Sequence, residues 1–303
     1  MNSPVLIWGL PEDPPTRAVH AWLVAHGAEV VLLDHAAVVD THADFGTCPD
    51  FVHRVSHNGR WWRLENFSAA YLRPYDVRAF ELAPAPLARA TLVHHLICDW
   101  AEYADTTIVN RPSAEATNHS KLRQAIEIRA SGFLTPESLV TNEPRRILGL
   151  QSRYGSVVYK SLSSVRSVVK ELSASDLPRT PIGPVLVQQR IRGVNMRVHV
   201  VGHRTFACRV ESDGVDYRYA RSTLVDVDLD DDVARRCVAL TRRLGLLVSG
   251  IDLITTAAGE WYCLEVNPNP GFTAFDSSGR EDVAKAVAEL LLEQPPIRVP
   301  SRS

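Results

Sequence analysis

The sequence predicts an α/β protein built from two or three lobes. It has 303 residues, 45% of them apolar, which is enough to bury a large core and more than one compact domain usually holds. The chain opens with the pattern of a strand, a helix and a strand, predicted at Val5–Trp8, residues 14–26 and Val30–Leu33. Strand patterns that alternate with helix patterns are typical of α/β folds.

Composition argues against several classes of partner. Lys and Arg number 33 against 35 Asp and Glu, and this formal charge of -2 lacks the footprint of a protein that binds nucleic acid or an anionic membrane. The five cysteines are far apart with no CxxC pair, which fits a reducing compartment. The start, MNSPVLIWGL, has no basic leader, and no apolar run reaches the ~18 residues of a spanning helix. We therefore expect a cytoplasmic protein that binds neither nucleic acid nor membrane.

The first 112 residues are predicted to form an open sheet. Asp34 follows the second strand as the acid of a dinucleotide site would, but the first turn, GLPEDPPT, lacks the glycines of such a site. Asn58-Gly59 predicts a hairpin, because a type I′ turn needs positive φ at both central residues. Another strand is expected at Ala70–Leu72, and a lobe boundary at Arg111-Pro112. Between them a helix over 86–103 is predicted from the spacing of Leu87, Leu92, Leu96 and Trp100.

Three more helices are expected beyond residue 112. The first has Asn118 as its N-cap and ends at Gly132, with Leu122, Ala125 and Ile126 in phase. The second spans about 231–244 after the acidic run 226–232, which we interpret as a solvated helix start rather than a calcium loop. The third spans about 281–293, and a frayed tail follows it.

Oxygen donors gather in the segment WYCLEVNPNPG, residues 261–271. On a strand, Glu265 and Asn267 face one side while Leu264 and Val266 face the other, and Pro268 ends the ladder. Mg²⁺ prefers oxygen ligands and is usually shared between one or two carboxylates and substrate phosphates. The segment therefore predicts a magnesium site; the alternative is a solvated Glu beside an Asn-Pro turn.

Asp252 is a second candidate oxygen donor. It interrupts the apolar strand GIDLI, and a buried carboxylate needs a partner or a metal. The turn at Ala258-Gly259 would lay strand 250–256 antiparallel to strand 260–267, so that Asp252 and Glu265 meet at one end of the hairpin. The alternative is in-and-out alternation with Asp252 in water.

Two lysines supply positive charge. Lys121 is expected in the first turn of its helix, where the helix dipole disfavours a cation unless an anion neutralises both, so a phosphate beside it is predicted. Lys160 ends the apolar run Val157-Val158-Tyr159 and is either a phosphate ligand or a residue at a solvated strand edge. The segment SLSSVRSV after it could cover phosphates or be a surface loop.

The run from Pro184 to Ile191 reads as a strand that leaves one lobe and turns into the next. Backbone at such a crossing can offer one carbonyl and one N–H to the edge of an adenine base, which leaves the side chains free to vary. The hinge is predicted at Gln188, Gln189, Arg190 and Ile191.

Five segments in this order resemble the ATP-grasp superfamily: NHSK at 118–121, VVYK at 157–160, VLVQQRIRGVNMRVHVVG from 185, GIDLI at 250–254 and LEVNPNPG at 264–271. Within it the chain is similar to the ribosomal protein S6 modification enzymes and to the ATP-grasp maturases of ribosomally made peptides. The resemblance runs from about residue 110 to residue 290.

The resemblance implies an ATP-grasp fold that binds ATP and Mg²⁺, and it implies a role for each matching residue. The two lysines, Lys121 and Lys160, would hold phosphates, the four hinge residues the adenine, and Asn195 the ribose. Arginines would face the acyl phosphate and the incoming carboxylate. The implied metal ligands are Asp252, Glu265 and Asn267, and the implied arginines are Arg197 and Arg218.

Three positions depart from the family pattern. Asn195 stands where an acid is usual, and no glycine lies between Lys160 and Lys170 in the segment that would cover the phosphates. Tyr71-Leu72-Arg73-Pro74 stands where the peptide maturases often carry paired arginines after an aromatic residue. These departures leave open how the ribose is held, whether the segment closes over ATP, and which substrate class is used.

We expect three lobes, at 1–112, 113–188 and 189–295, with ATP between the last two and a tail at 296–303. The expected function is a ligase that phosphorylates a carboxylate and passes the acyl group to an amine or hydroxyl, with a ribosomally made peptide as one candidate substrate and a homodimer as one assembly. The alternatives are a small-molecule amino-acid ligase and a module that binds ATP without catalysis. Cys208 and Cys263 lie in apolar strands, where packing is expected of them.

Overall fold

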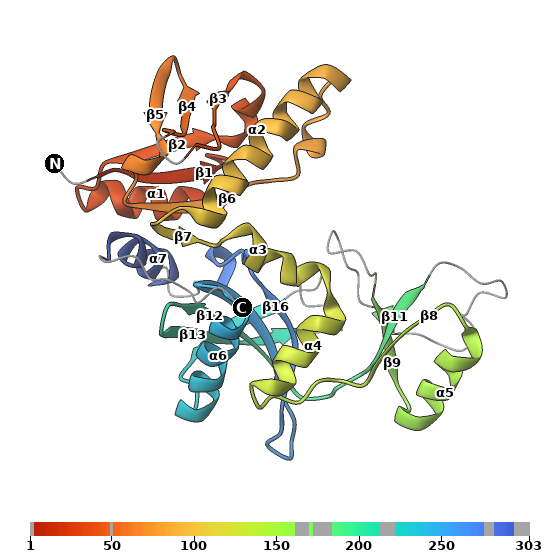
Figure 1. Cartoon of the computed structure of the whole chain (residues 1–303). Helices are drawn as coiled ribbons and strands as arrows, with labels where there is room; N and C mark the ends of the chain where they lie inside the picture. Colours follow the sequence, from red (N-terminus) through yellow and green to blue (C-terminus); the bar gives the residue numbers. More distant parts are fainter. Residues whose placement is uncertain are drawn as a thin grey trace.

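A computed structural model describes residues 3–48, 51–160, 170–171, 184–212, 222–275 and 282–293. Within these residues the strands form four sheets (Figure 1). The predicted elements at the start of the chain are confirmed, and the chain ends its described part in a helix that lies between two of the sheets.

The first sheet is open and parallel, as predicted, with the order β2-β1-β6-β7. Its strands are β1 (Val5–Gly9), β2 (Val30–Asp34), β6 (Ala69–Arg73) and β7 (Thr107–Val109). Alternate side chains of these strands pack on helix α1 (Pro14–Ala25) on one face and on α2 (Pro84–Tyr103) on the other. All four strands therefore end at the same edge of the sheet.

A small antiparallel sheet lies beside the first one, in the order β3-β4-β5. Asn58 and Gly59 join β4 to β5 with φ of 51° and 73°, so the predicted hairpin is confirmed. Its strands are β3 (His42–Asp44), β4 (Arg54–His57) and β5 (Arg60–Arg63), and short 3-10 turns η1 (His35–Asp40), η2 (Leu64–Asn66) and η3 (Val77–Phe80) flank them.

Helix α2 lies where it was predicted, and its predicted apolar stripe is partly right, because Trp100 is buried and Leu87 packs against the core. Leu92 is exposed, whereas Val93 and Ile97 are buried against the sheet. The helix carries two apolar stripes, and the spacing of residues alone does not say which one the sheet takes.

The second large sheet is antiparallel, in the order β10-β9-β11-β8. It has a small core of its own, made by Ile147, Val157 and Val187. Its elements are β8 (Ser138–Thr141), α5 (Pro144–Tyr154), β9 (Val157–Lys160), β10 (Lys170–Glu171) and β11 (Val185–Gln189). Among the described residues, this core is separate from the cores of the other sheets.

The third sheet is antiparallel, in the order β14-β13-β12-β15-β16. Its strands are β12 (Val194–Val201), β13 (Arg204–Ser212), β14 (Ser222–Val227), β15 (Val248–Thr255) and β16 (Trp261–Asn267). The predicted hairpin of β15 and β16 is confirmed. Helix α6 (Asp231–Arg243) begins with an Asp230 cap and an acidic first turn, so the acidic run is a helix start as predicted.

Short helices α3 (Pro112–Glu115) and η4 (Ala116–His119) lead to α4 (Lys121–Ala130). The cap of α4 is Ser120, not Asn118, because the Ser120 hydroxyl accepts the N–H of Arg123 at 3.3 Å. The apolar stripe predicted through Leu122 and Ile126 is also wrong, since both are exposed; the helix buries Ile128 against the third sheet instead.

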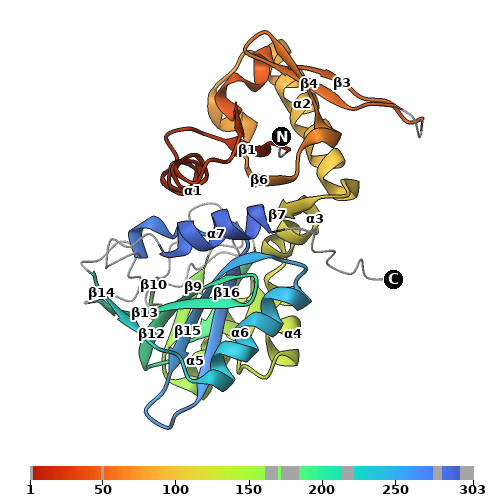
Figure 2. The ribbon, with the colours of Figure 1, turned by 90° about the vertical axis from the view of Figure 1, so that its left-hand side faces the viewer.

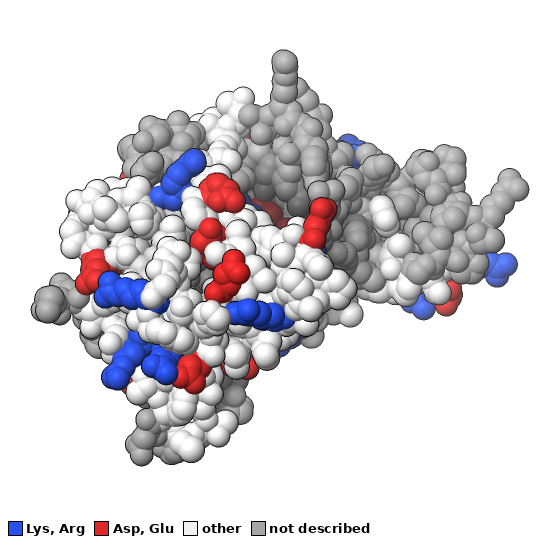
Figure 3. All heavy atoms as spheres, turned by 90° about the horizontal axis from the view of Figure 1, so that it is seen from above, with Lys and Arg blue, Asp and Glu red and all other residues white. Residues whose placement is uncertain are grey.

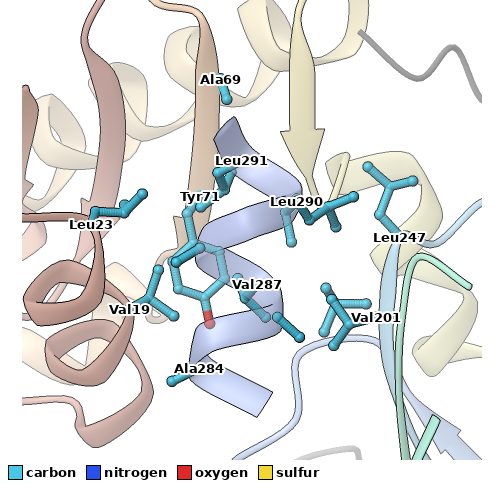
Figure 4. Packing of buried hydrophobic residues seen from close by; sticks show 14 of the residues in the cluster. Val19, Leu23, Ala69, Tyr71, Val201, Leu247, Ala284, Val287, Leu290 and Leu291 are labelled. Carbon is cyan, nitrogen blue, oxygen red and sulfur yellow. The ribbon is translucent and has the colours of Figure 1, made fainter. Parts of the chain in front are cut away.

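Helix α7 (Asp282–Leu292) lies between the first and third sheets (Figure 2). Its apolar residues face both ways, toward α1 and the first sheet on one side and toward β12 on the other (Figure 4). Leu291 lies near Ala69 and Tyr71, while Leu290 and Val287 face Leu247 and Val201 (Figure 4). One continuous core therefore joins these two sheets.

No helix in the described part of the chain is long and apolar enough to cross a membrane. On the face seen from above, Lys and Arg side chains are interspersed with Asp and Glu (Figure 3). Among the described residues of that face, neither sign of charge forms a continuous patch.

Replacing Leu291 by Ala should destabilise the protein by about 2–5 kcal/mol, because the side chain is fully buried between the two sheets. Leu292→Ala is the matched control. Leu292 is 44% exposed, so this substitution should change stability by less than about 0.5 kcal/mol. Urea unfolding followed by fluorescence measures both, and equal effects would contradict the packing described for α7.

Candidate functional site

One cross-strand row of the third sheet carries three of the predicted site residues. Arg197 on β12 stands opposite Asp252 on β15, and Asp252 stands opposite Glu265 on β16. On the other side Arg197 pairs with Cys208, and Cys208 pairs with Asp226. Directly opposed residues of antiparallel strands share a face, so these side chains lie on the face away from α6. The predicted meeting of Asp252 with Glu265 is confirmed.

Two carboxylates of this row, those of Asp252 and Glu265, each pair with a cation. Arg197 Nη1 donates to Asp252 Oδ1 at 2.8 Å, and the Arg197 side chain is almost fully buried. Lys121 Nζ approaches Glu265 Oε2 at 3.4 Å and donates to Asn118 Oδ1 at 3.0 Å. Because like charges so close together would repel, these pairs allow two acids to stand side by side on neighbouring strands.

Lys121 is the first residue of α4, as predicted. The prediction that only a phosphate would justify a cation there is incomplete, because Glu265 supplies a negative charge from 144 residues away. A lysine at a helix start beside a carboxylate is neutralised before any ligand binds.

A β-bulge in the β15–β16 pair changes one predicted orientation. Asp252 pairs with Glu265, but Leu253 pairs with Cys263, so Leu264 is the extra residue. Cys263 and Val266 therefore fill the apolar layer, and the prediction that Leu264 lies there is wrong. Leu264 instead lines a small cavity of about 40 Å³.

Asn267 is in the next row, opposite Gly250. Its Oδ1 accepts the backbone N–H of Asn269 at 3.0 Å. The side chain is half-buried at the end of β16, on the same side as Glu265, as predicted.

A residue that the sequence analysis missed holds the free edge of β16. Gln124 of α4 is buried, its Nε2 donates to the Val266 carbonyl at 2.7 Å, and its Oε1 accepts the Val266 N–H at 3.0 Å. The amide thus imitates a neighbouring strand between the two predicted metal ligands. A glutamine inside a predicted helix gives no signal of this role, because its partner is 142 residues away.

The predicted hinge joins β11 to β12. Gln188 donates to Ser138 Oγ at 3.0 Å, and the N–H groups of Gln189 and Arg190 donate to the carbonyls of Glu137 and Ser156 at 2.8 and 3.0 Å. These two N–H groups are therefore already engaged inside the protein. The small cavity brings Gln188 together with Lys121 and Glu265.

Three predicted residues have less structural detail. Lys160 ends β9, where it pairs with Leu186 of β11, but its side chain lies outside the described atoms. Arg218 and the segment 161–169 lie outside the described residues. Asn195 lies on β12 two positions before Arg197, hence on the same face, and is half-buried.

His199 was also missed. It is buried two residues after Arg197, whose Nε approaches His199 Nε2 at 3.3 Å. Burial, and then the charge of Arg197, hold the pKa of His199 well below its ordinary value, so the ring is neutral and can accept from the guanidinium. Beside it lies a cavity of about 330 Å³, whose walls include Cys208, Asp226 and Phe275. A side chain or a small acid would fit in that volume.

The oxygen donors at this row suit a hard cation. Among the described residues no three His, Cys, Asp or Glu side chains gather as a metal site. The predicted set has two carboxylates and one amide oxygen, from Asp252, Glu265 and Asn267. Mg²⁺ commonly takes one or two protein carboxylates and completes its shell with phosphate oxygens and water, so this set fits Mg²⁺ bound together with a nucleotide.

The chain is similar in sequence to a known family and to several named proteins. The model of the RimK-like ATP-grasp domain matches residues 153–291. A protein of Xanthomonas oryzae pv. oryzae named probable alpha-L-glutamate ligase is 32% identical over 214 residues, covering 63% of this chain and 70% of the relative. One of the same name from Rhodopirellula baltica is 26% identical over 211 residues, and there the match spans about half of the relative, 52%.

Solved structures resemble the chain over nearly its full length. The ATP-grasp ligase PsnB, in complex with a minimal precursor, has a TM-score of 0.80 at 26% identity, covering 96% of this chain and 99% of PsnB. The macrocyclase MdnC of Microcystis aeruginosa, bound with its precursor peptide MdnA, has a TM-score of 0.80 at 19% identity, covering 95% and 99%, a likeness of fold.

The cysteines near the row should be unreactive. Burial raises the pKa of Cys208 to about 11, those of Cys98 and Cys237 to about 12, and that of Cys263 well above its ordinary value, so little thiolate exists at pH 8. Iodoacetamide at pH 8 should modify only exposed Cys48 in the folded protein, and all five cysteines after unfolding in guanidinium. Mass spectrometry counts the adducts. As the control, folded Cys48→Ser should carry no adduct. Fast labelling of Cys208 or Cys263 in the folded protein would contradict their packing role.

Proposed function

The chain belongs to the RimK-like ATP-grasp family of ligases, and on that premise we propose that it activates a carboxylate with ATP and joins it to an amine or hydroxyl of a peptide. The predicted ATP-grasp fold is confirmed by the match to PsnB. ATP and Mg²⁺, as predicted, are the cofactors of such ligases; PsnB was solved with Mg and ADP.

The observation that carries the proposal is the row that joins Arg197, Asp252 and Glu265 on one face, with Lys121 beside Glu265. Oxygen donors for a metal and cations for phosphates and carboxylates alternate there within contact distance. Such alternation is what phosphoryl transfer to a carboxylate needs, because negative charge develops on both groups.

The two ion pairs suggest how the site exchanges partners. Asp252, Glu265 and Asn267 would hold Mg²⁺, which would offset the negative charge of the two carboxylates and of the nucleotide phosphates. Lys121 would then be released from Glu265 to hold a phosphate, and Arg197 would present its fork to a planar carboxylate or an acyl phosphate. His199 would keep the Arg197 guanidinium oriented by accepting from its Nε.

The remaining assignments are proposals at the same site. Lys160 would join Lys121 at the phosphates, the backbone of Gln188–Ile191 would face adenine, and Asn195 would face the ribose. Arg218 would bind the carboxylate that is phosphorylated. The lobe boundaries at 112 and 188, a cytoplasmic location and a homodimer stay predictions.

A peptide is the preferred acceptor or acid because PsnB and MdnC were solved with precursor peptides and match almost the whole chain. The second candidate, a ligase for a free amino acid such as glutamate, is favoured by the names of the sequence relatives. ADP release measured against peptides and against free amino acids, with mass spectrometry of the product, separates the two. An ATP-binding module without catalysis would give no ADP with any of them.

Glu265→Gln should lower ADP formation at least 100-fold, about 2.7 kcal/mol of barrier, because a neutral amide oxygen binds Mg²⁺ more weakly than a carboxylate does. The control is Glu260→Gln, an exposed residue just before the same strand, which should keep full activity. Activity of Glu265→Gln within about tenfold of the parent would remove Glu265 from the metal set.

Lys121→Met should weaken ATP binding about 10- to 100-fold, the loss of a charge-assisted contact to phosphate of roughly 1.5–3 kcal/mol. Arg123→Met, an exposed residue on the same helix, is the matched control and should leave the affinity unchanged. Titration calorimetry measures both, and an unchanged Kd for Lys121→Met would leave this lysine as a partner of Glu265 alone.

A further inference from the structure

The loop after β16, residues 268–271, is hydrogen-bonded to residues at the ends of β6 and β7 in the first sheet. Asn110, directly after β7, is buried; its Nδ2 donates to the carbonyls of Pro268 at 2.6 Å and Val248 at 2.8 Å. Its Oδ1 accepts the N–H groups of Leu247 at 2.8 Å and Val248 at 3.1 Å. One amide therefore ties the loop to the start of β15.

A second set of hydrogen bonds to this loop comes from Arg73, the last residue of β6. Its side chain is buried, and Nη1 donates to the Pro270 carbonyl at 3.1 Å and to Asn269 Oδ1. The backbone N–H of Asn269 in turn donates to Asn267 Oδ1 at 3.0 Å. Contacts thus run without a break from the first sheet to the amide oxygen of a proposed metal ligand.

Arg73 is itself fixed in orientation. Its Nε donates to Asp13 Oδ2 at 2.8 Å, while Asp13 Oδ1 accepts the hydroxyl of Tyr75 at 3.0 Å and Oδ2 accepts the N–H of Thr16 at 3.1 Å. Burial opposes ionisation of Asp13, but Arg73 and these donors outweigh it, and the pKa of Asp13 lies below its ordinary value. The guanidinium has therefore little freedom to turn.

The loop needs such external donors. Pro268 and Pro270 have no N–H, so the backbone cannot close a regular hydrogen-bonded turn through them. Gly250, opposite Asn267, packs so tightly that an added Cβ would overlap the Arg197 guanidinium and come within 2.8 Å of Pro270. A shift of the loop would therefore disturb both Asn267 and Arg197.

We propose that Arg73 and Asn269 are positioning residues that hold Asn267 at the coordination distance of Mg²⁺, a role that rests on the magnesium site proposed above. Mg²⁺ demands near-octahedral geometry and tolerates little displacement of its ligands. Residues that hydrogen-bond a ligand from behind commonly tune metal affinity by 10- to 100-fold. The first lobe, which supplies no proposed ligand itself, thereby sets the affinity for the metal.

Binding of ADP tests the proposal without turnover. We would measure the Kd for ADP by calorimetry in excess Mg²⁺ and in EDTA, for Asn269→Ala, Arg73→Gln and their double variant. Asn269→Ala is the central variant, because it leaves the Arg73–Asp13 pair intact and so avoids a buried unpaired acid. Arg78→Gln, an exposed arginine of the same lobe paired with Asp76, is the control.

Asn269→Ala and Arg73→Gln should each weaken ADP binding in Mg²⁺ about tenfold and change it less than about twofold in EDTA. The double variant should lose no more than Arg73→Gln alone, because the contact between Arg73 and Asn269 that Asn269→Ala removes is already lost in Arg73→Gln. Asn269→Asp keeps an oxygen acceptor and should retain the gain from Mg²⁺. A merely structural contact would alter both conditions equally or only the melting temperature, which would overturn the proposal.

Glu265→Gln in the same assay distinguishes failure of the magnesium site from failure of the positioning role. If Glu265→Gln loses the gain from Mg²⁺ while Asn269→Ala keeps it, the magnesium site stands and the positioning role of the first lobe is wrong. If Glu265→Gln keeps the gain, the magnesium site itself is wrong, and the positioning role falls with it.

Discussion

Burial of α7 on two sides is the packing on which the rest of the arrangement depends. A helix between two sheets removes apolar surface of both from water, and the apolar side chains of α7 join β1, β6 and β12 into a single core. The edge where β6 and β7 end is thereby held against the loop after β16. Without α7, Arg73 and Asn110 would have no fixed distance to Pro268 and Pro270.

The second sheet is supported differently, and this difference bears on function. Its core is small and separate, whereas the first and third sheets share theirs. A sheet with a separate core can move relative to its neighbours at lower cost than sheets that share a core, so we would expect such motion at the hinge proposed at the end of β11. A nucleotide at the proposed site would lie between this sheet and the third one.

Charge pairing lets the floor of the site exist before any ligand binds. Two carboxylates side by side would repel, but Arg197 and Lys121 neutralise them from opposite sides. In the proposed mechanism the same four groups would then bind Mg²⁺ and phosphates by changing partners. Such a site is folded in advance and needs no large rearrangement to accept its cofactors, which lowers the cost of binding.

Local patterns in the sequence predicted many of the strands, most helices, the hairpins and the oxygen donors of LEVNPNPG, because periodicity, turn residues and motif order are properties of neighbouring residues. The same patterns gave the resemblance to the family. The face of α4, and part of the face of α2, were predicted wrongly for the same reason: each helix has more than one apolar stripe, and only the partner decides between them. The cap of α4 and the bulge at Leu264 were equally outside the reach of simple alternation.

Only the tertiary structure decided which distant groups meet. Lys121 with Glu265, Gln124 with Val266, and Arg73 with Asn269 join residues more than 140 positions apart. No period of 2 or 3.6 residues encodes such pairs, since they arise when separately folded elements pack and their buried polar groups must find donors and acceptors. The sequence by itself therefore determined the chemistry available to this protein, and packing decided how that chemistry is held in place.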